Sequence, residues 1–203
     1  RSLNFWTLDE YKQFIQTMEP GTRYYLIFEM LFWTGCRIGE LLAITKADIN
    51  FEKNQLSINK TYYRTGMQDI ITEPKTKQSF RTIEIPEFLK EEIKEFVDGH
   101  YGMPDTERLF PVVQEAVQHK MKRQIELAGV KKIRVHDLRH SHVAYLIEKG
   151  VEPLLIRDRL GHKDIRITLN TYGHLYPNQQ RKIANLLDNE NAVTGLGEER
   201  DEC

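Results

Sequence analysis

Six polar side chains, scattered along the sequence, are of the types that bind and transfer a phosphoryl group. Two guanidiniums can each donate paired hydrogen bonds to phosphate oxygens. Two imidazoles, an ammonium and a phenol can supply proton transfer and a nucleophile. The candidates are Arg37, Lys75, His136, Arg139, His162 and Tyr172. We interpret them as a site that breaks and rejoins a phosphodiester through the tyrosine.

His136 and Arg139 are the two candidates closest together, three residues apart at the expected start of a helix. Residues at this spacing share one face of a helix. A helix N-terminus adds backbone donors and a partial positive charge that favour an anion. The pair can therefore bind one phosphate, although a capped helix start with an ordinary histidine would use the same residues.

The remaining candidates also have ordinary structural interpretations. Arg37 follows a glycine break and would form a surface ion pair with Glu40, three residues on. Lys75 lies in a turn between two expected strands, where lysines are usually solvated. Tyr172 follows His162 by ten residues, at a spacing that also suits a core tyrosine. The occurrence of all six together favours the functional interpretation.

A metal site is not expected from the histidines. His136, His140 and His142 lie close together, but the spacing lacks a companion cysteine pair and an HExxH motif. We expect His140 and His142 to be core or supporting residues. No cofactor and no metal are predicted.

The charge distribution bears on the partner. The 203 residues carry a net charge of −1, which by itself argues against DNA. However, residues 188–203 hold six acids and one base, and without them 28 basic and 24 acidic residues remain. Residues 119–166 hold twelve Lys or Arg against six acids. This uneven charge favours a double-stranded DNA partner, and the alternative is a plain solvated surface.

Composition places the chain among globular proteins, with 40% hydrophobic and 29% charged residues. The most apolar run, residues 24–33, is too short to span a bilayer. We see no signal peptide, and Cys36 and Cys203 do not make a disulfide framework. We therefore expect a cytoplasmic protein in a reducing compartment, with no membrane partner.

The expected fold class is α+β, a mainly α-helical domain with a small antiparallel three-stranded sheet. A capping box at Thr7 and Glu10 opens the first helix. Strands are predicted over residues 55–63, 69–73 and 80–85, with Lys75 in a hairpin turn. Further helices are predicted over residues 22–33, 37–42, 86–97, 112–128, 137–149, 152–160, 164–172 and 177–187.

Taken together, these motifs resemble the tyrosine recombinase (phage-type integrase) family. The matching blocks are Thr34-Gly35-x-Arg37-x-x-Glu40, the Lys75 segment, His136-x-x-Arg139, Leu160-Gly161-His162 and Tyr172, in the family's order. The match extends over about residues 5–187. Each block is weak alone, and the set is specific.

The resemblance implies a role for each residue. Tyr172 would be the nucleophile, and Arg37 and Arg139 would bind the scissile phosphate. His136 would accept the proton, and His162 would donate to a phosphate oxygen. Lys75 would be the general acid. Lys77 could face the same side, and we favour Lys75 because its Lys-Thr step matches the family pattern.

The resemblance also implies an activity and a domain organisation. We expect a metal-independent enzyme of a phage or other mobile element that recombines or integrates DNA through a 3′-phosphotyrosyl intermediate, and that assembles as a dimer or tetramer on DNA. Residues 1–187 would be the catalytic domain and residues 188–203 an acidic, mobile tail, with a core-binding domain absent from the chain. The alternatives are a type IB topoisomerase, a non-catalytic DNA-binding module and a metal-dependent nuclease.

Overall fold

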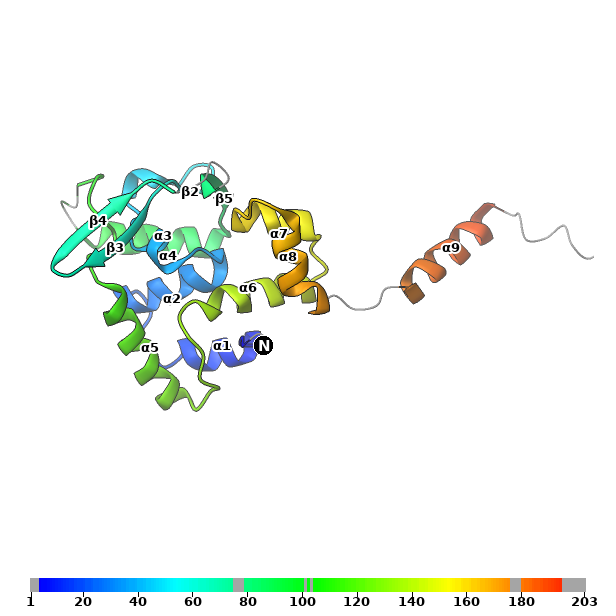
Figure 1. Cartoon of the computed structure of the whole chain (residues 1–203), viewed down its shortest axis with the longest axis horizontal. Helices are drawn as coiled ribbons and strands as arrows, with labels where there is room; N and C mark the ends of the chain where they lie inside the picture. The colour runs from blue at the N-terminus through cyan, green and yellow to red at the C-terminus, as the bar shows by residue number, and fades with distance from the viewer. Residues whose placement is uncertain (1–3, 75–78, 101, 103, 176–179, 195–203) are drawn as a thin grey trace, which may run out of the picture.

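The computed structural model describes residues 4–74, 79–100, 102, 104–175 and 180–194, and the side chains of residues 180–183 and 192–194 are not included. Helices make up most of it (Figure 1). They are α1 (Leu8–Ile15), α2 (Arg23–Thr34), α3 (Ile38–Leu41), α4 (Glu87–Asp98), α5 (Gln114–Ala128), α6 (Asp137–Glu148), α7 (Pro153–Leu160), α8 (Ile165–Tyr172) and α9 (Gln180–Thr194), with single 3-10 turns at Lys46–Asp48 and Gly173–Leu175. These helices follow the predicted ones closely.

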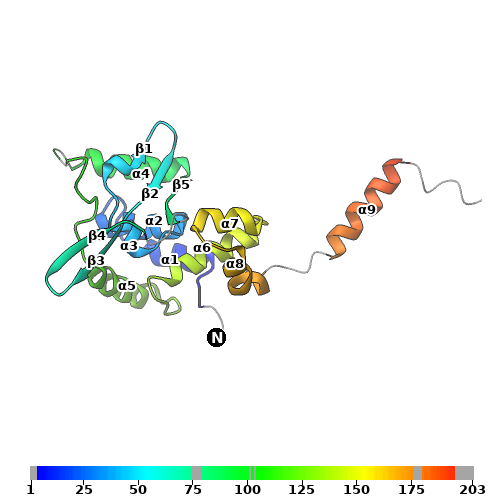
Figure 2. The same ribbon diagram turned by 45° about the horizontal axis from the view of Figure 1, so that its top comes forward.

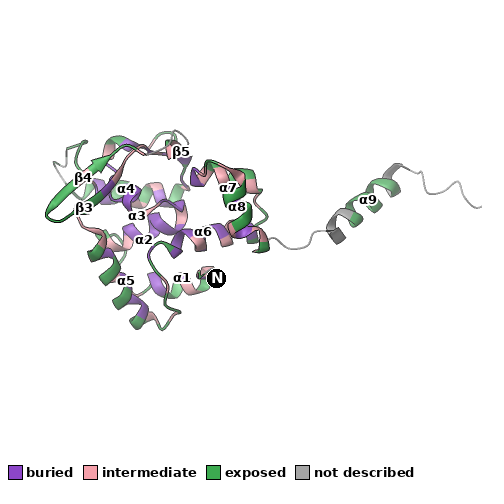
Figure 3. Cartoon of the chain, in the orientation of Figure 1, coloured by how far each residue is buried: buried purple, intermediate pink, exposed green. Residues whose placement is uncertain are grey.

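Helix α2 lies at the centre of the body, as its apolar sequence requires. Its residues from Leu26 to Phe32 are all buried, and a helix buried on every side needs neighbours all round. Helices α1, α3, α4 and α6 pack against it (Figure 3). The C-terminal end of α2 is therefore fixed in the core, and the segment that carries Arg37 starts from this point.

A second, smaller apolar cluster joins α6, α7 and α8. Its buried members are Val143, Ile147, Ile156, Leu160 and Tyr172. Figure 2 shows these three helices gathered on one side of the body. The cluster brings Tyr172, the last residue of α8, against α6, where its hydroxyl meets a side chain 32 positions earlier in the chain. Tyr172 is thus positioned by packing.

The strands differ from the prediction. One antiparallel sheet has the order β1 (Ile49–Asn50), β2 (Gln55–Ile58) and β5 (Arg81–Glu84), with Leu56 opposite Ile83. A separate hairpin pairs β3 (Thr61–Thr65) with β4 (Gln68–Thr72). The sheet has three strands as predicted, but β1 was not foreseen and the single strand predicted over residues 55–63 is wrong.

Side-chain contacts explain why that strand divides. Asn59 Nδ2 donates to Asp48 Oδ1 at 3.0 Å, and Lys60 Nζ binds Asp48 Oδ2. Asp48 is buried, so its carboxylate requires these partners. The backbone at Asn59 and Lys60 leaves the sheet to supply them, and β3 starts a new pairing.

The predicted hairpin around Lys75 is also wrong in its pairing. β4 pairs with β3, and β5 pairs with β2, so the segment between β4 and β5 joins two different sheets. Lys75 and Lys77 themselves lie outside the described residues. Their assignment as general acid stays a prediction.

The final helix is longer than predicted. It was expected to end near Leu187, but α9 continues to Thr194, because residues 188–194 contain neither proline nor glycine. Residues 184–191 are exposed, and Figure 1 shows α9 apart from the other helices. In the part of the chain that is described, no helix has the length and apolarity needed to cross a membrane.

Candidate active site

Five of the six candidate residues lie at or next to the ends of helices α3, α6, α7 and α8. Arg37 is the N-cap of α3, His136 is the N-cap of α6, and Arg139 lies in the first turn of α6. His162 lies between α7 and α8, and Tyr172 ends α8. The charge of Arg37 lowers the pKa values of the other four, so the five groups share one electrostatic environment.

Arg139 is the buried centre of this group. Its Nη1 donates to the carbonyl of Gly35 at 2.7 Å, and its Nη2 donates to the carbonyl of Leu160 at 2.8 Å. These carbonyls end α2 and α7, where helices leave acceptors without partners and carry partial negative charge. Burial, and then the charge of Arg37, lower the pKa of Arg139 to about 9, and the group remains protonated at neutral pH.

Gly35 makes this arrangement possible. Its φ of +66° ends α2 in the left-handed conformation. A Cβ at this position would lie 2.5 Å from Cδ2 of His142 in α6. The glycine predicted as a helix break therefore also allows α6 to pack close to α2, which brings Arg139 within reach of the Gly35 carbonyl.

Glu40 holds two guanidiniums. Its Oε1 accepts from Arg37 Nη1 at 2.8 Å, and both of its oxygens accept from Arg81, at 3.1 and 2.8 Å. Burial alone would raise the pKa of Glu40, but the hydrogen bonds and charge of Arg81, followed by those of Arg37, lower it to about 2. The predicted pairing of Arg37 with Glu40 is confirmed. The Arg37 side chain stays 41% exposed and can still reach a ligand.

Arg81 is a member of this network that the sequence analysis missed. It opens β5 and its Nε donates to the carbonyl of Arg159 at 2.8 Å, which ties the sheet to α7. An arginine within an alternating strand is not unusual in a sequence. Its role in holding Glu40 is seen only from the hydrogen bond between the two residues, which are 41 positions apart. A polar pocket of about 370 Å³ lies beside it and is lined by Phe80, Arg81, Arg157, Asp158, Gly161, His162 and Lys163.

His162 is held in one tautomer. Its Nε2 lies 3.0 Å from Arg139 Nη2, which can only donate, so Nε2 accepts. Its Nδ1 therefore carries the proton and donates to Thr168 Oγ1 at 2.9 Å. Burial and the charge of Arg139 lower the pKa of His162 to about 4. In this tautomer the ring accepts a hydrogen bond from Arg139 and helps to hold the guanidinium in place. For Nε2 to donate to a phosphate oxygen instead, the ring would have to change tautomer.

His136 is exposed at the start of α6. Its ring makes no hydrogen bond to any residue that the structure describes, and it meets the His140 ring edge-on at a centroid distance of 5.3 Å. Partial burial and the neighbouring His140 lower its pKa. His136 also lines a pocket of about 570 Å³, together with apolar residues such as Met121 and Ile125 and the basic residues Lys122, Lys132 and Arg134.

Tyr172 is only 2% exposed. Its hydroxyl lies 2.7 Å from Nδ1 of His140, a residue that the sequence analysis had assigned to the core or to support. Burial raises the pKa of Tyr172 to about 12, although the charges of Arg139 and Arg37 act to lower it. The phenol is thus buried, close to two guanidiniums, and bonded to an imidazole.

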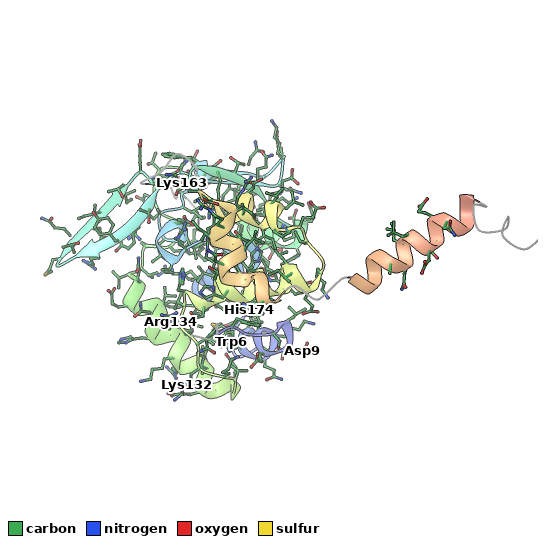
Figure 4. All side chains as sticks on the ribbon, turned by 45° about the vertical axis from the view of Figure 1, so that its right-hand side comes forward. Trp6, Asp9, Lys132, Arg134, Lys163 and His174 are labelled. Carbon is green, nitrogen blue, oxygen red and sulfur yellow. The ribbon has the colours of Figure 1, made fainter. Side chains whose placement is uncertain are left out.

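Further basic residues surround the group. Figure 4 shows Lys163 at the N-terminal end of α8 and His174 just beyond its C-terminal end, with Lys132 and Arg134 on the segment between α5 and α6. Such positive charge around buried guanidiniums suits a polyanion. Among the described residues, no cluster of three or more His, Cys, Asp or Glu is arranged to bind a metal.

Comparison with known proteins gives a family match. The model of the Phage integrase family matches residues 4–179. The chain is 32% identical over 202 residues to the ICEBs1 integrase of Bacillus subtilis strain 168, and the match covers 93% of this chain and 55% of that protein. It is 30% identical over 206 residues to a XerC-like tyrosine recombinase of Caldanaerobacter subterraneus, covering 89% and 53%. The chain spans about half the length of these curated relatives.

Solved structures give the same fold. The Tn1549 transposon integrase in complex with a circular intermediate DNA superposes with a TM-score of 0.77 at 20% identity, covering 94% of this chain and 66% of that one. XerA recombinase superposes with a TM-score of 0.68 at 20% identity, covering 92% and 63%. These likenesses confirm the predicted fold class.

Proposed function

The chain belongs to the phage integrase family, and from this premise we propose that it is the catalytic part of a site-specific DNA recombinase. Its reaction breaks and rejoins DNA strands through a 3′-phosphotyrosyl intermediate on Tyr172. The observation that carries the proposal is the contact network around the tyrosine. Arg139 binds the carbonyls that end α2 and α7 and lies 3.0 Å from His162, and the Tyr172 hydroxyl lies 2.7 Å from His140, the residue after Arg139.

The proposed chemistry uses cationic side chains to stabilise the transition state. Attack by an oxygen builds negative charge on the nonbridging oxygens of the phosphodiester. Arg37, partly exposed and anchored by Glu40, and Arg139, anchored by two carbonyls, are held in place to receive that charge. Each such preorganised donor contributes roughly 3 kcal/mol, by analogy with oxyanion holes.

The remaining steps conserve the energy of the broken bond. The Tyr172 oxygen bonds to phosphorus as the bond to the 5′ oxygen breaks, and Lys75 is the predicted donor of a proton to that leaving oxygen. A 5′ hydroxyl from a partner strand then attacks the phosphotyrosine and releases the phenol. Because the ester bond stores the energy, no nucleotide triphosphate is needed.

The substrate is double-stranded DNA in this proposal. The basic segment from α5 to the start of α8 supports it, as do relatives named as the ICEBs1 integrase, a prophage integrase and a transposon integrase. The biological role that we propose is therefore integration or recombination of a mobile element, in the cytoplasm of a bacterium. Cys36, a buried free thiol, is compatible with a reducing compartment.

Self-assembly on DNA is part of the proposal. The exposed residues of α9 include Leu186 and Leu187. A pocket of about 360 Å³ between the N-terminal segment and α6 is lined largely by apolar residues, among them Trp6, Leu8, Ile147 and Leu175. We assign α9 of a second copy as its occupant, because an exposed leucine pair and an apolar pocket complement each other.

The direct test is covalent capture of DNA. The protein is incubated with a pool of nicked duplexes of varied sequence and separated on a denaturing gel, and the adduct is mapped by mass spectrometry. We expect the adduct on Tyr172 and its complete loss in Tyr172→Phe, with DNA binding retained. Tyr145→Phe, in the neighbouring helix α6, is the matched control and should keep the adduct.

Three outcomes would contradict the proposal. An adduct in Tyr172→Phe would assign the nucleophile elsewhere. DNA binding with no adduct in the unmodified protein would identify a binding module. Relaxation of supercoiled DNA without strand exchange would identify a topoisomerase.

A further inference from the structure

Of the residues that the structure describes, His140 is the one whose side chain is hydrogen-bonded to the reacting atom of the proposed nucleophile. Its Nδ1 lies 2.7 Å from Tyr172 Oη, and the two ring centroids are 5.6 Å apart. A hydroxyl within hydrogen-bond distance of an imidazole nitrogen is the geometry of a nucleophile paired with its base. Among the described residues, no other side chain makes a hydrogen bond to this hydroxyl.

The direction of this hydrogen bond follows from the two groups. Burial raises the pKa of Tyr172, and burial also lowers the pKa of His140. At neutral pH the phenol therefore keeps its proton and the imidazole is uncharged. The phenol O–H donates to Nδ1 of His140, and the imidazole proton lies on Nε2. This is the protonation state that a base needs before the reaction.

The charges around the pair suit a proton transfer. Arg139 faces both groups and Arg37 faces Tyr172, and these two cations favour the phenolate. Asp137, in the same helix as His140, favours the imidazolium that would form, while Arg139 and then Arg134 oppose it. Arg134 is itself paired with Asp137 at 2.7 Å, and His136 meets the His140 ring edge-on.

His136 is less well placed for the same task. It is exposed, and its ring makes no hydrogen bond to Tyr172 in the described structure. Because Tyr172 is 2% exposed, bulk water is also excluded as an acceptor at this position. His136 remains available to contact a phosphate oxygen directly.

We propose that His140, rather than His136, accepts the proton of Tyr172 during strand cleavage. This inference rests on the proposed function. The Oη–P bond forms, the bond from phosphorus to the 5′ oxygen breaks, and the phenol proton passes to Nδ1 of His140. The leaving oxygen takes its proton from the predicted acid Lys75. In the rejoining step the imidazolium returns its proton to the departing phenolate.

The test is the pH dependence of single-turnover cleavage in His140→Asn. Asparagine can keep a hydrogen bond to Tyr172 but cannot take up its proton. In the unmodified protein the rate should rise with pH as the imidazole loses its proton and then level off. The variant should lose about 100-fold or more at pH 7. Its residual rate should rise tenfold per pH unit without levelling, because it then follows the small fraction of Tyr172 that is already phenolate at each pH.

Three controls isolate the assignment. His136→Asn should keep the levelling profile even though its rate falls. His119→Asn, an exposed position on α5, should match the unmodified protein. A substrate with sulfur in place of the 5′ bridging oxygen needs no general acid, so it should not rescue His140→Asn. Unchanged DNA affinity of the variants shows that they are folded. If His140→Asn does not fold, the same test is made with His140→Gln.

The opposing results are distinct. A levelling profile that persists in both His140 variants would overturn the assignment. Faster cleavage in His140→Asn would also overturn it. Such a result would mean that the hydrogen bond between His140 and Tyr172 holds the tyrosine away from the phosphate. Failure of the unmodified protein to cleave DNA at any pH would remove the proposed function and this assignment with it.

Discussion

Glu40 and Arg81 form a buried ion pair with two hydrogen bonds, which joins helix α3 to strand β5. The Nη2–Oε2 distance is 2.8 Å and the Nη1–Oε1 distance is 3.1 Å, and both side chains are 6% exposed. The same carboxylate holds Arg37. A residue of the sheet therefore fixes the position of an arginine proposed to bind the phosphate.

Arg81→Ala should lower both stability and cleavage. The substitution leaves Glu40 buried with only one cation, and breaking a buried pair in this way costs about 3 kcal/mol of unfolding free energy. Cleavage should fall because the Arg37 anchor loosens. Urea denaturation and single-turnover cleavage measure the two effects. Arg166→Ala removes the exposed pair with Asp164 and should change stability little; equal losses in both variants would refute the role of burial.

Gly35→Ala should lower the free energy of unfolding by about 3 kcal/mol. Alanine is strained in the left-handed backbone conformation, and its Cβ would clash with a buried side chain. The new Cβ would meet the His142 ring at 2.5 Å. Gly66 is the matched control, because its φ is +60° but no atom lies within 4 Å of an added Cβ. Gly66→Ala should therefore cost about 1 kcal/mol. Thermal and urea unfolding test the difference, and equal costs would contradict the close approach of α6 to α2.

The stability contributed by His162 should depend on pH. Its pKa in the folded protein is about 4, below the ordinary value of 6.5, so the unfolded chain takes up the proton first as the pH falls. The contribution is fully present above pH 6.5 and is lost between pH 6.5 and 4. His162→Gln should therefore be less stable than the unmodified protein at pH 7.5, and the two should converge by pH 4.5.

A comparison of variants is needed because other groups titrate in the same window. Burial raises the pKa of Glu92 to about 7, which acts in the opposite direction between pH 4.5 and 7. Glu40, whose pKa is lowered from 4.5 to about 2, contributes fully above pH 4.5 and loses that contribution only below it. Urea denaturation at several pH values gives the difference between His162→Gln and the unmodified protein. A gap between His162→Gln and the unmodified protein that stays constant with pH would disprove the buried neutral imidazole.

Leu187→Glu should weaken assembly without changing the fold of the single chain. Leu187 is 60% exposed on α9, so a carboxylate there costs little in the monomer but would be buried in the pocket of a second copy. Sedimentation of the protein on DNA should show the loss of dimers or tetramers. Leu127→Glu, at a position 65% exposed on α5, is the control and should assemble normally. Equal assembly of the two variants would argue against docking by α9.

Much of the fold could be predicted because its signals are local. The capping box at Thr7 and Glu10, the apolar run of α2 and the glycine at position 35 each act within a few residues. Helix boundaries follow from such signals. The order of the candidate residues along the chain was enough to indicate the family, which the family match confirms. The roles assigned to the six residues stay predictions.

The tertiary structure alone decided what these residues contact. The break between β2 and β3 depends on the buried Asp48, and the roles of Arg81 and His140 depend on partners 41 and 32 positions away. Periodicity places a side chain on one face of a helix or strand, but it carries no information about which atom of another element that face will meet. The types of the reactive groups were therefore readable from the sequence, whereas the tautomer of His162, the burial of Tyr172 and its bond to His140 arise only when α6, α7 and α8 pack together.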